Sequence, residues 1–145
     1  MSNEQNRALV CRFLENVWNE GNWAAIEDGL ATNFILHVPS AAGQPPGPAV
    51  YQQAVTRFRA AFPNLHTTIE DVMAEGDKVV IRGTDRATHR GEFMGIPATG
   101  KQVTVTWIGI YRVTDGKIAE EWGSMDSLGL LQQLGIMPSP EQSGK

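Results

Sequence analysis

The dipeptide Asp115-Gly116 stands between two long runs that alternate apolar and polar residues, 103–114 and 117–125. Both central positions of a type I′ turn need positive φ, and Asp-Gly is a preferred pair there. The two runs are therefore predicted to form an antiparallel hairpin. Because side chains alternate between the two faces of a strand, counting outward from the turn also predicts which residues share a face.

An uninterrupted register from this turn places five cross-strand pairs on one face. They are Val113 with Ile118, Tyr111 with Glu120, Gly109 with Trp122, Trp107 with Ser124, and Val105 with Asp126. Aromatic rings and two carboxylates then share a surface, which is typical neither of a solvent-facing wall nor of a plain core. A pocket lined by apolar and polar groups accounts for both.

A second hairpin is predicted over residues 65–90, with its turn at 75–78. The register from this turn pairs Val72 with Ile81 and Ala74 with Val79, and Asp71 with Arg82 on the other face. The same alternation places Asp85 and His89 on the apolar face.

Helical spacing of apolar residues occurs mainly before the long strands. The predicted helices run from a capping box at Ser2 and Gln5 to about Asn19, from Asn22 to about Leu30, from Pro48 to Phe62, and from Ser127 to Gly135, with a short strand at 33–39. Segregated helices and a long antiparallel meander indicate an α+β fold in which a curved sheet wraps around the helices. We predict one domain over residues 1–137 and a frayed tail over 138–145.

Charge and composition exclude several kinds of partner. The net charge is −4 and the basic residues are scattered, which argues against a nucleic-acid surface and a basic membrane-binding helix. No leader and no apolar run of transmembrane length is evident, so a cytoplasmic protein is expected. Cys11 lies in a helical pattern and is expected to be a buried small hydrophobe. The three histidines lack metal-ligand spacing, so neither a metal nor a cofactor is predicted.

Several segments resemble the SnoaL-like polyketide cyclases of the NTF2-like superfamily. They are residues 88–101, Asp115-Gly-Lys-Ile118, Glu120-x-Trp122-x-x-x-Asp126 and residues 130–135, and the similarity runs over nearly the whole chain. It implies a cone with a curved antiparallel or mixed sheet around about three N-terminal helices and a short C-terminal helix. Glu121 and Gly123 depart from the His and Asp of many relatives, which leaves the substrate open.

The resemblance also implies that the acid/base carboxylate of the cyclases stands at Asp126. We then expect a cofactor-independent cyclase, lyase or isomerase that abstracts a proton next to a carbonyl of a small apolar compound. The carbanion would close a ring in an aldol step, and His89 or a water would protonate the new alkoxide. Trp122 and Val105 are predicted to desolvate Asp126. Asp126 also fits a helix cap, because it directly precedes a helical segment.

The predicted pocket has a wider lining. Its members are His37, Phe93, Trp107, Tyr111, Glu120 and Trp122. Glu120 is expected to pair with the hydroxyl of Tyr111, and Phe93 belongs to a Gly-rich excursion interpreted as a rim or lid. For two of the histidines a purely structural role is an open alternative. His89 would then be a hydrogen-bonded core histidine, and His37 a loop residue without a role in the pocket.

Two other functions remain open at this point. A non-catalytic binder of small hydrophobic ligands would use the same cone, and an epoxide hydrolase would need two carboxylates bridged by an arginine inside it. The predicted register puts the strand arginines on the opposite face. That face also carries Ile108, Ile110 and Met125, which favours a homodimer through the sheet.

Overall fold

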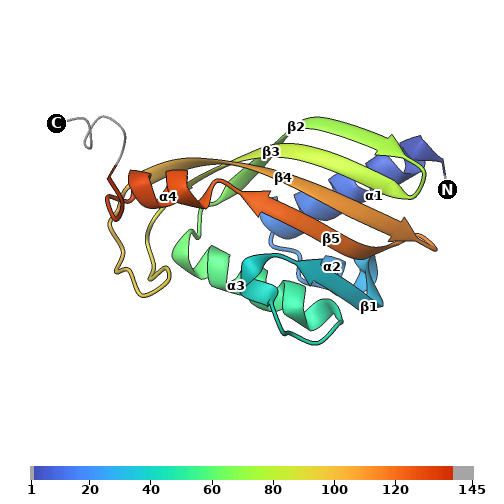
Figure 1. The fold of residues 1–145 in the computed structure, drawn as a ribbon, viewed down its shortest axis with the longest axis horizontal. Helices are drawn as coiled ribbons and strands as arrows, with labels where there is room; N and C mark the ends of the chain where they lie inside the picture. The colour runs from blue at the N-terminus through green and yellow to red at the C-terminus, as the bar shows by residue number, and fades with distance from the viewer. Residues whose placement is uncertain (1, 139–145) are drawn as a thin grey trace.

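The fold is built on a mixed five-stranded sheet with the strand order β1-β5-β4-β3-β2, and the helices pack against this sheet (Figure 1). This computed structural model describes residues 2–138. The helices are α1 (Asn3–Leu14), α2 (Ala24–Gly29), α3 (Pro48–Ala61) and α4 (Ser127–Gln133), with a π-helical turn η1 (Glu15–Asn19) and a 3₁₀ turn η2 (Pro39–Ala41). The strands are β1 (Leu30–His37), β2 (His66–Glu75), β3 (Lys78–Thr88), β4 (Gln102–Thr114) and β5 (Lys117–Met125). The predicted α+β fold is confirmed.

The helical predictions hold with small shifts. The capping box of Ser2 and Gln5 is present, and the π-helical turn continues α1 to Asn19 as expected. The second helix starts at Ala24, so Trp23 and not Asn22 is its N-cap. The strand predicted over 33–39 begins earlier and pairs in parallel with β5, which makes the sheet mixed.

Both hairpins form around the expected turns. The β2–β3 register matches the prediction, with Val72 opposite Ile81. At the second turn Asp115 has φ 52° and Gly116 has φ 75°, as a type I′ turn requires. Local turn chemistry therefore decided where these strands start.

The register of the second hairpin is correct only beside its turn. Val113 faces Ile118 as expected, but Arg112 faces Glu120, so Ala119 is an extra residue on β5. Such a bulge moves every later residue to the opposite face. The predicted pairs of Tyr111 with Glu120 and of Gly109 with Trp122 are wrong.

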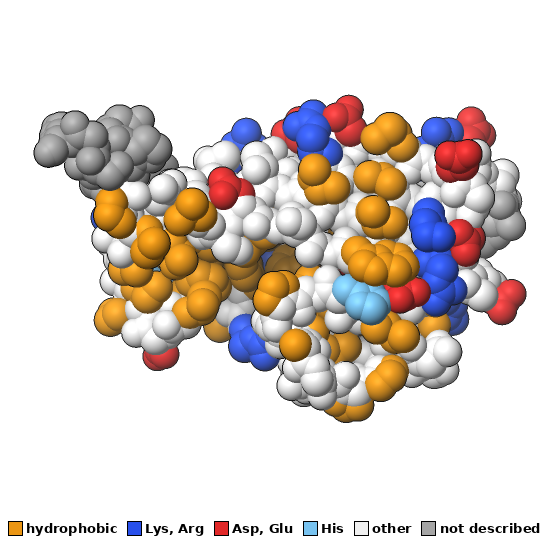
Figure 2. All heavy atoms as spheres, viewed as in Figure 1, with side chains coloured by type: hydrophobic (Ala, Val, Ile, Leu, Met, Phe, Trp, Pro, Cys, Tyr) orange, Lys and Arg blue, Asp and Glu red, His pale blue; other side chains and the backbone are white. Residues whose placement is uncertain are grey.

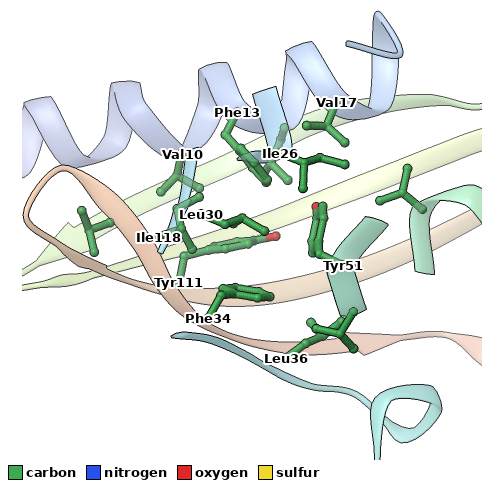
Figure 3. Close-up of a cluster of buried hydrophobic side chains, with 14 of the residues drawn as sticks. Val10, Phe13, Val17, Ile26, Leu30, Phe34, Leu36, Tyr51, Tyr111 and Ile118 are labelled. Carbon is green, nitrogen blue, oxygen red and sulfur yellow. The ribbon is translucent and has the colours of Figure 1, made fainter. Parts of the chain in front are cut away.

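The core has two parts that meet at Trp18. The first lies between α1, α3 and the inner face of the sheet, where Figure 3 shows Tyr51 and Tyr111 among aliphatic side chains. The second lies near Phe62 and Leu130, at the end where α4 covers β4. Trp18 packs against both parts. The predicted tail lies, apart from Pro138, outside the described residues, and within them no helix is long and apolar enough to span a membrane.

Candidate functional site

The bulge at Ala119 turns Glu121 toward the helices. Glu121 stands between Leu36 on β1 and Tyr111 on β4, and Val79 of β3 follows in the same cross-strand row. Its neighbours in this row are buried apolar or aromatic side chains. A carboxyl group thus lies on the inner face of the sheet at a position that the uninterrupted register assigned to the outer face.

Several side chains on inward-facing surfaces remain partly exposed. Asp85, Trp107 and Met125 extend from the sheet, while Trp18 and Phe58 extend from the helices toward it. Their partial exposure fits an interior that opens to solvent on one side. Figure 2 shows the surface hollowed between α3 and β5, with hydrophobic side chains around the opening. We take this hollow as the candidate active site.

Glu121 has no hydrogen-bond or ion-pair partner among the side chains of residues 2–138. The residue as a whole is partly exposed, but protein atoms surround its carboxyl group, and this burial raises the pKa of Glu121 to about 8. Burial raises the pKa of Tyr51 and of Tyr111, and the nearby Glu121 carboxyl adds to both shifts. These three groups form one electrostatically coupled cluster.

Asp85 is a second interior carboxyl group, with a different environment. Trp107 donates its indole N–H to Asp85 Oδ1 at 2.9 Å and to Thr67 Oγ1 at 3.2 Å. Burial raises the pKa of Asp85, whereas hydrogen bonds from Thr67 and Trp107 oppose that rise. Asp85 is therefore suited to act as a fixed anion that orients Trp107, whereas Glu121 is suited to take up and release a proton.

Glycines allow the aromatic rings to lie flat on the sheet. A Cβ atom at Gly83 would overlap the indole ring of Trp107, and one at Gly109 would lie 2.8 Å from the hydroxyl oxygen of Tyr111. Beside them, a Cβ at Gly123 would lie 3.3 Å from Glu121 Oε2. The wall of the hollow thus consists of rings and a carboxyl group laid over glycine backbone.

Three of the predicted pocket residues lie on the outer face instead. His37 Nε2 contacts Glu120 Oε2 at 2.6 Å, and its ring stacks on Trp122 with centroids 5.1 Å apart. Glu120 also accepts a hydrogen bond from Arg112 at 3.0 Å. The assignment of His37, Glu120 and Trp122 to the pocket is wrong. The bulge inverts β5 after Ala119, whereas His37 faces outward because its neighbour on β1, Leu36, packs into the core.

Asp126 lies at the surface, where β5 ends and α4 begins. It is the exposed N-cap of α4, where Oδ1 accepts a hydrogen bond from the backbone N–H of Gly129 at 2.9 Å. Val105 pairs with Asp85 on the inner face, and Trp122 lies outside. The expected desolvation of Asp126 between these two residues is therefore wrong, and the helix-cap alternative is confirmed.

The remaining predicted residues lie on the inner side. Trp107 and Tyr111 occupy the inner face as expected, and Phe93 packs edge-on against Phe58, with ring centroids 5.7 Å apart. His89 is 0% exposed, and its Nδ1 accepts the backbone N–H of Thr99 at 3.2 Å.

His89 lies at the far end of the inner wall from Glu121. Val79, in the row of Glu121, comes ten residues before His89, which is about 30 Å along an extended strand. His89 Nε2 is buried and has no hydrogen-bond partner among the described residues. The role of His89 as a proton donor to substrate stays a prediction.

Sequence reasoning missed Glu121, Tyr51 and Trp18. Two signals in β5 indicate the bulge: Ile118 and Ala119 are consecutive apolar residues, and Arg112 and Glu120 carry opposite charges that the uninterrupted register puts on different faces. Both residues of the apolar pair are buried. In the described part of the chain, no three His, Cys, Asp or Glu side chains gather as a metal-binding group.

Comparison with known proteins gives concordant matches. The family model for SnoaL-like polyketide cyclases matches residues 8–134. The chain is 33% identical to aklanonic acid methyl ester cyclase DauD of Streptomyces sp. strain C5, over 92% of this chain and 84% of that protein. The solved structure of AclR from Streptomyces galilaeus superposes with TM-score 0.83 at 30% identity, covering 95% of this chain and 85% of AclR. TsrD from Streptomyces laurentii gives TM-score 0.80 at 32% identity, covering 90% and 98%.

Proposed function

Because the chain belongs to the SnoaL-like polyketide cyclase family and has its NTF2-like fold, we propose that it closes a ring in a small apolar carbonyl compound without a cofactor. The reaction takes place in the hollow between α3 and β5, and Glu121 transfers the proton. The observation that carries this proposal is the inward Glu121 carboxyl group, whose pKa of about 8 lies close to neutral pH.

The proposed chemistry is an intramolecular aldol addition. Ionised Glu121 removes a proton from a carbon that lies between two carbonyl groups, which gives an enolate. The enolate carbon attacks a second carbonyl of the same molecule, so one C–C bond forms and one C=O bond becomes an alkoxide. Protonated Glu121 returns the proton to the alkoxide, and the product is an isomer of the substrate. A positioned base contributes about 10² to 10⁴ in rate, and the hollow supplies the orientation.

The surroundings of Glu121 favour this assignment over an epoxide hydrolase. Two interior carboxyl groups are present, Glu121 and Asp85, but Arg82 of β3 and Arg112 of β4 pair with other acids on the outer face. Arg82 contacts Asp71 at 2.7 Å, and Arg112 contacts Glu120 at 3.0 Å. Among the described residues no arginine joins the two interior carboxyl groups.

A proton-exchange experiment separates the cyclase from the ligand-binding alternative. The wild-type protein in D₂O should catalyse deuterium incorporation into the central carbon of 1,3-dicarbonyl compounds with ketone and ester groups, followed by NMR. Glu121→Gln keeps the shape but cannot take the proton, so exchange should fall by about 10² or more. Glu120→Gln, one residue away on the outer face, is the matched control and should exchange like the wild type.

Two results would count against the proposal. Absence of exchange by the wild type across a series of dicarbonyls of increasing size would favour a non-catalytic binder. Equal exchange by wild type and Glu121→Gln would place the base elsewhere, and His89 would be the next residue to replace.

We also propose a homodimer through the outer face of the sheet. Met73, Val80, Ile110 and Trp122 form one cross-strand row there, here called the outer band. Met73 is 62% exposed and neighbouring Ile108 is 51% exposed, and Figure 2 shows hydrophobic side chains across this face. Acidic and basic pairs flank the outer band on both sides, so a second copy related by a two-fold axis offers both apolar surface and opposite charge. Met125, expected on this face, lies inside opposite Trp107.

A further inference from the structure

Tyr51 of α3 presents a hydroxyl group whose oxygen is already engaged. The indole N–H of Trp18 donates to Tyr51 Oη at 2.8 Å, and the two rings meet edge to face with centroids 6.4 Å apart. We propose that the Tyr51 hydroxyl donates a hydrogen bond to the enolate oxygen of the substrate, and that Trp18 positions it. This inference rests on the proposed function, because it supplies the oxyanion donor that the aldol reaction requires.

The hydroxyl proton of Tyr51 is not used in its hydrogen bond with Trp18. A phenolic hydroxyl can accept and can also donate once, whereas an indole N–H can only donate. Since Trp18 donates, the Tyr51 proton is available to a different acceptor. No acceptor among the described residues takes it. A buried donor without an acceptor costs free energy, so a ligand oxygen at this position would be favoured.

The location of Tyr51 matches the reaction that Glu121 would carry out. Tyr51 is 3% exposed and lies in the first core part, where Figure 3 shows the hydroxyl end of Tyr111 directed toward it. Burial raises the pKa of Tyr51, and the carboxyl groups of Glu121 and Asp85 add to the rise, so the hydroxyl keeps its proton at neutral pH. Trp18, adjacent to the hydroxyl, is partly exposed and packs against both parts of the core.

The two residues have different roles. Tyr51 would touch the developing negative charge, so it is a catalytic residue in the proposed reaction. Trp18 acts through Tyr51: its N–H fixes the direction of the hydroxyl and polarises it, because hydrogen bonds in a chain strengthen one another. The π-helical turn that carries Trp18 is a local irregularity of a kind that is frequent at functional sites.

The test uses two readouts on the full-length protein. Tyr51→Phe should lower deuterium exchange into the dicarbonyl by about 10² to 10³, the usual loss for one oxyanion donor. The second readout is the ionisation of bound 2-naphthol, followed by its absorbance between pH 6 and 9. The wild type should lower the apparent pKa of bound 2-naphthol, because the naphtholate resembles an enolate, and Tyr51→Phe should lose this effect.

Trp18→Phe keeps an aromatic ring but lacks the N–H. It should retain part of the naphthol shift, whereas Trp23→Phe, at an exposed tryptophan on the N-cap of α2, should match the wild type. Binding of 2-methoxynaphthalene, which cannot ionise, should be unchanged in Tyr51→Phe, and this separates loss of the donor from loss of the fold.

The donor proposal and the cyclase proposal fail in different ways. If Glu121→Gln abolishes exchange while Tyr51→Phe stays within about threefold of the wild type, the donor proposal is overturned and the base assignment stands. A wild type that leaves the pKa of bound 2-naphthol unchanged would also overturn the donor proposal. Loss of the naphthol shift in Tyr51→Phe, with no exchange by the wild type, would support an oxyanion-binding site and remove the cyclase.

Discussion

Glu121 and Tyr111 are cross-strand neighbours on the inner face of the sheet, and one extra residue on β5, Ala119, puts them there. Without that bulge Tyr111 would face Glu120, whose carboxylate instead bridges His37 and Arg112 on the outer face. Two adjacent glutamates thus have opposite environments. Pairing lowers the pKa of Glu120, first through His37, whereas burial raises the pKa of Glu121 to about 8.

The raised pKa of Glu121 predicts a pH-dependent stability. Between its ordinary value of 4.5 and about 8, the folded protein holds a proton that the unfolded chain has released. The free energy of unfolding should therefore fall as pH rises through this window, by at most about 1.4 kcal/mol per pH unit from this one group. Urea unfolding at pH 5, 6, 7 and 8 measures it, with Glu121→Gln as the variant that lacks the carboxyl group.

The difference between Glu121→Gln and wild type isolates this contribution from other titrating groups. The variant should gain stability relative to the wild type as pH increases from 5 to 8. Glu70→Gln, at an exposed glutamate on β2, is the matched control, because its carboxyl group is not buried. A constant difference for Glu121→Gln would contradict the buried environment described for its carboxyl group.

Asp126 is expected to matter for stability and not for proton transfer. Asp126→Ala removes the N-cap of α4 and should lower the free energy of unfolding by about 0.5 to 2 kcal/mol, whereas Asp126→Asn should change it little because Asn caps comparably. Both variants should exchange deuterium into the dicarbonyl like the wild type. A 10²-fold loss of exchange in Asp126→Asn would instead support the catalytic role implied by the family resemblance.

We expect that the Trp107 ring can keep its position only if residue 83 is glycine. In Gly83→Ala the new Cβ overlaps the indole, so the ring must leave Asp85 and Thr67, at a cost of about 1 to 3 kcal/mol. In a double-mutant cycle, Gly83→Ala with Trp107→Leu should cost less than the sum of the single changes, with a coupling of about 0.5 to 3 kcal/mol. The same cycle with the distant Trp23→Leu should be additive.

If the outer band forms the dimer interface, a charged side chain placed within it should separate the two copies. The wild type should run as a dimer in light scattering at micromolar concentration, and Ile110→Glu, in the middle of the band, should run as a monomer with native circular dichroism. Leu128→Glu places the same charge at an exposed apolar residue of α4, outside the band, and should remain dimeric. A monomeric wild type would remove the proposal.

Local sequence chemistry predicted most of the fold. Turn residues such as Asp115 and Gly116 set where strands begin, and apolar periodicity together with capping residues located the four helices, because these signals act within a few residues. The β2–β3 register was predicted correctly from its turn alone. β2 also has a register shift, near Ile69, but this shift lies farther from the turn than the pairs that were predicted.

The face of each residue on β5 was decided only by the tertiary structure. Strand alternation has a period of two, so one bulged residue inverts every later assignment, and both Ile118 and Ala119 beside that bulge are buried. The inversion moved Glu120 and Trp122 out of the predicted pocket and brought Glu121 into it, and His37 of β1 faces outward beside Trp122.

The same limit applies to Trp18 and Tyr51. Both belong to helical apolar patterns, which sequence alone reads as core, and they lie 33 residues apart. Their hydrogen bond exists because α3 packs across the sheet beside the turn after α1, a long-range contact that no local pattern encodes. The chain thus determined by itself that a curved sheet would enclose helices, whereas the packing of those helices decided which polar groups meet inside it.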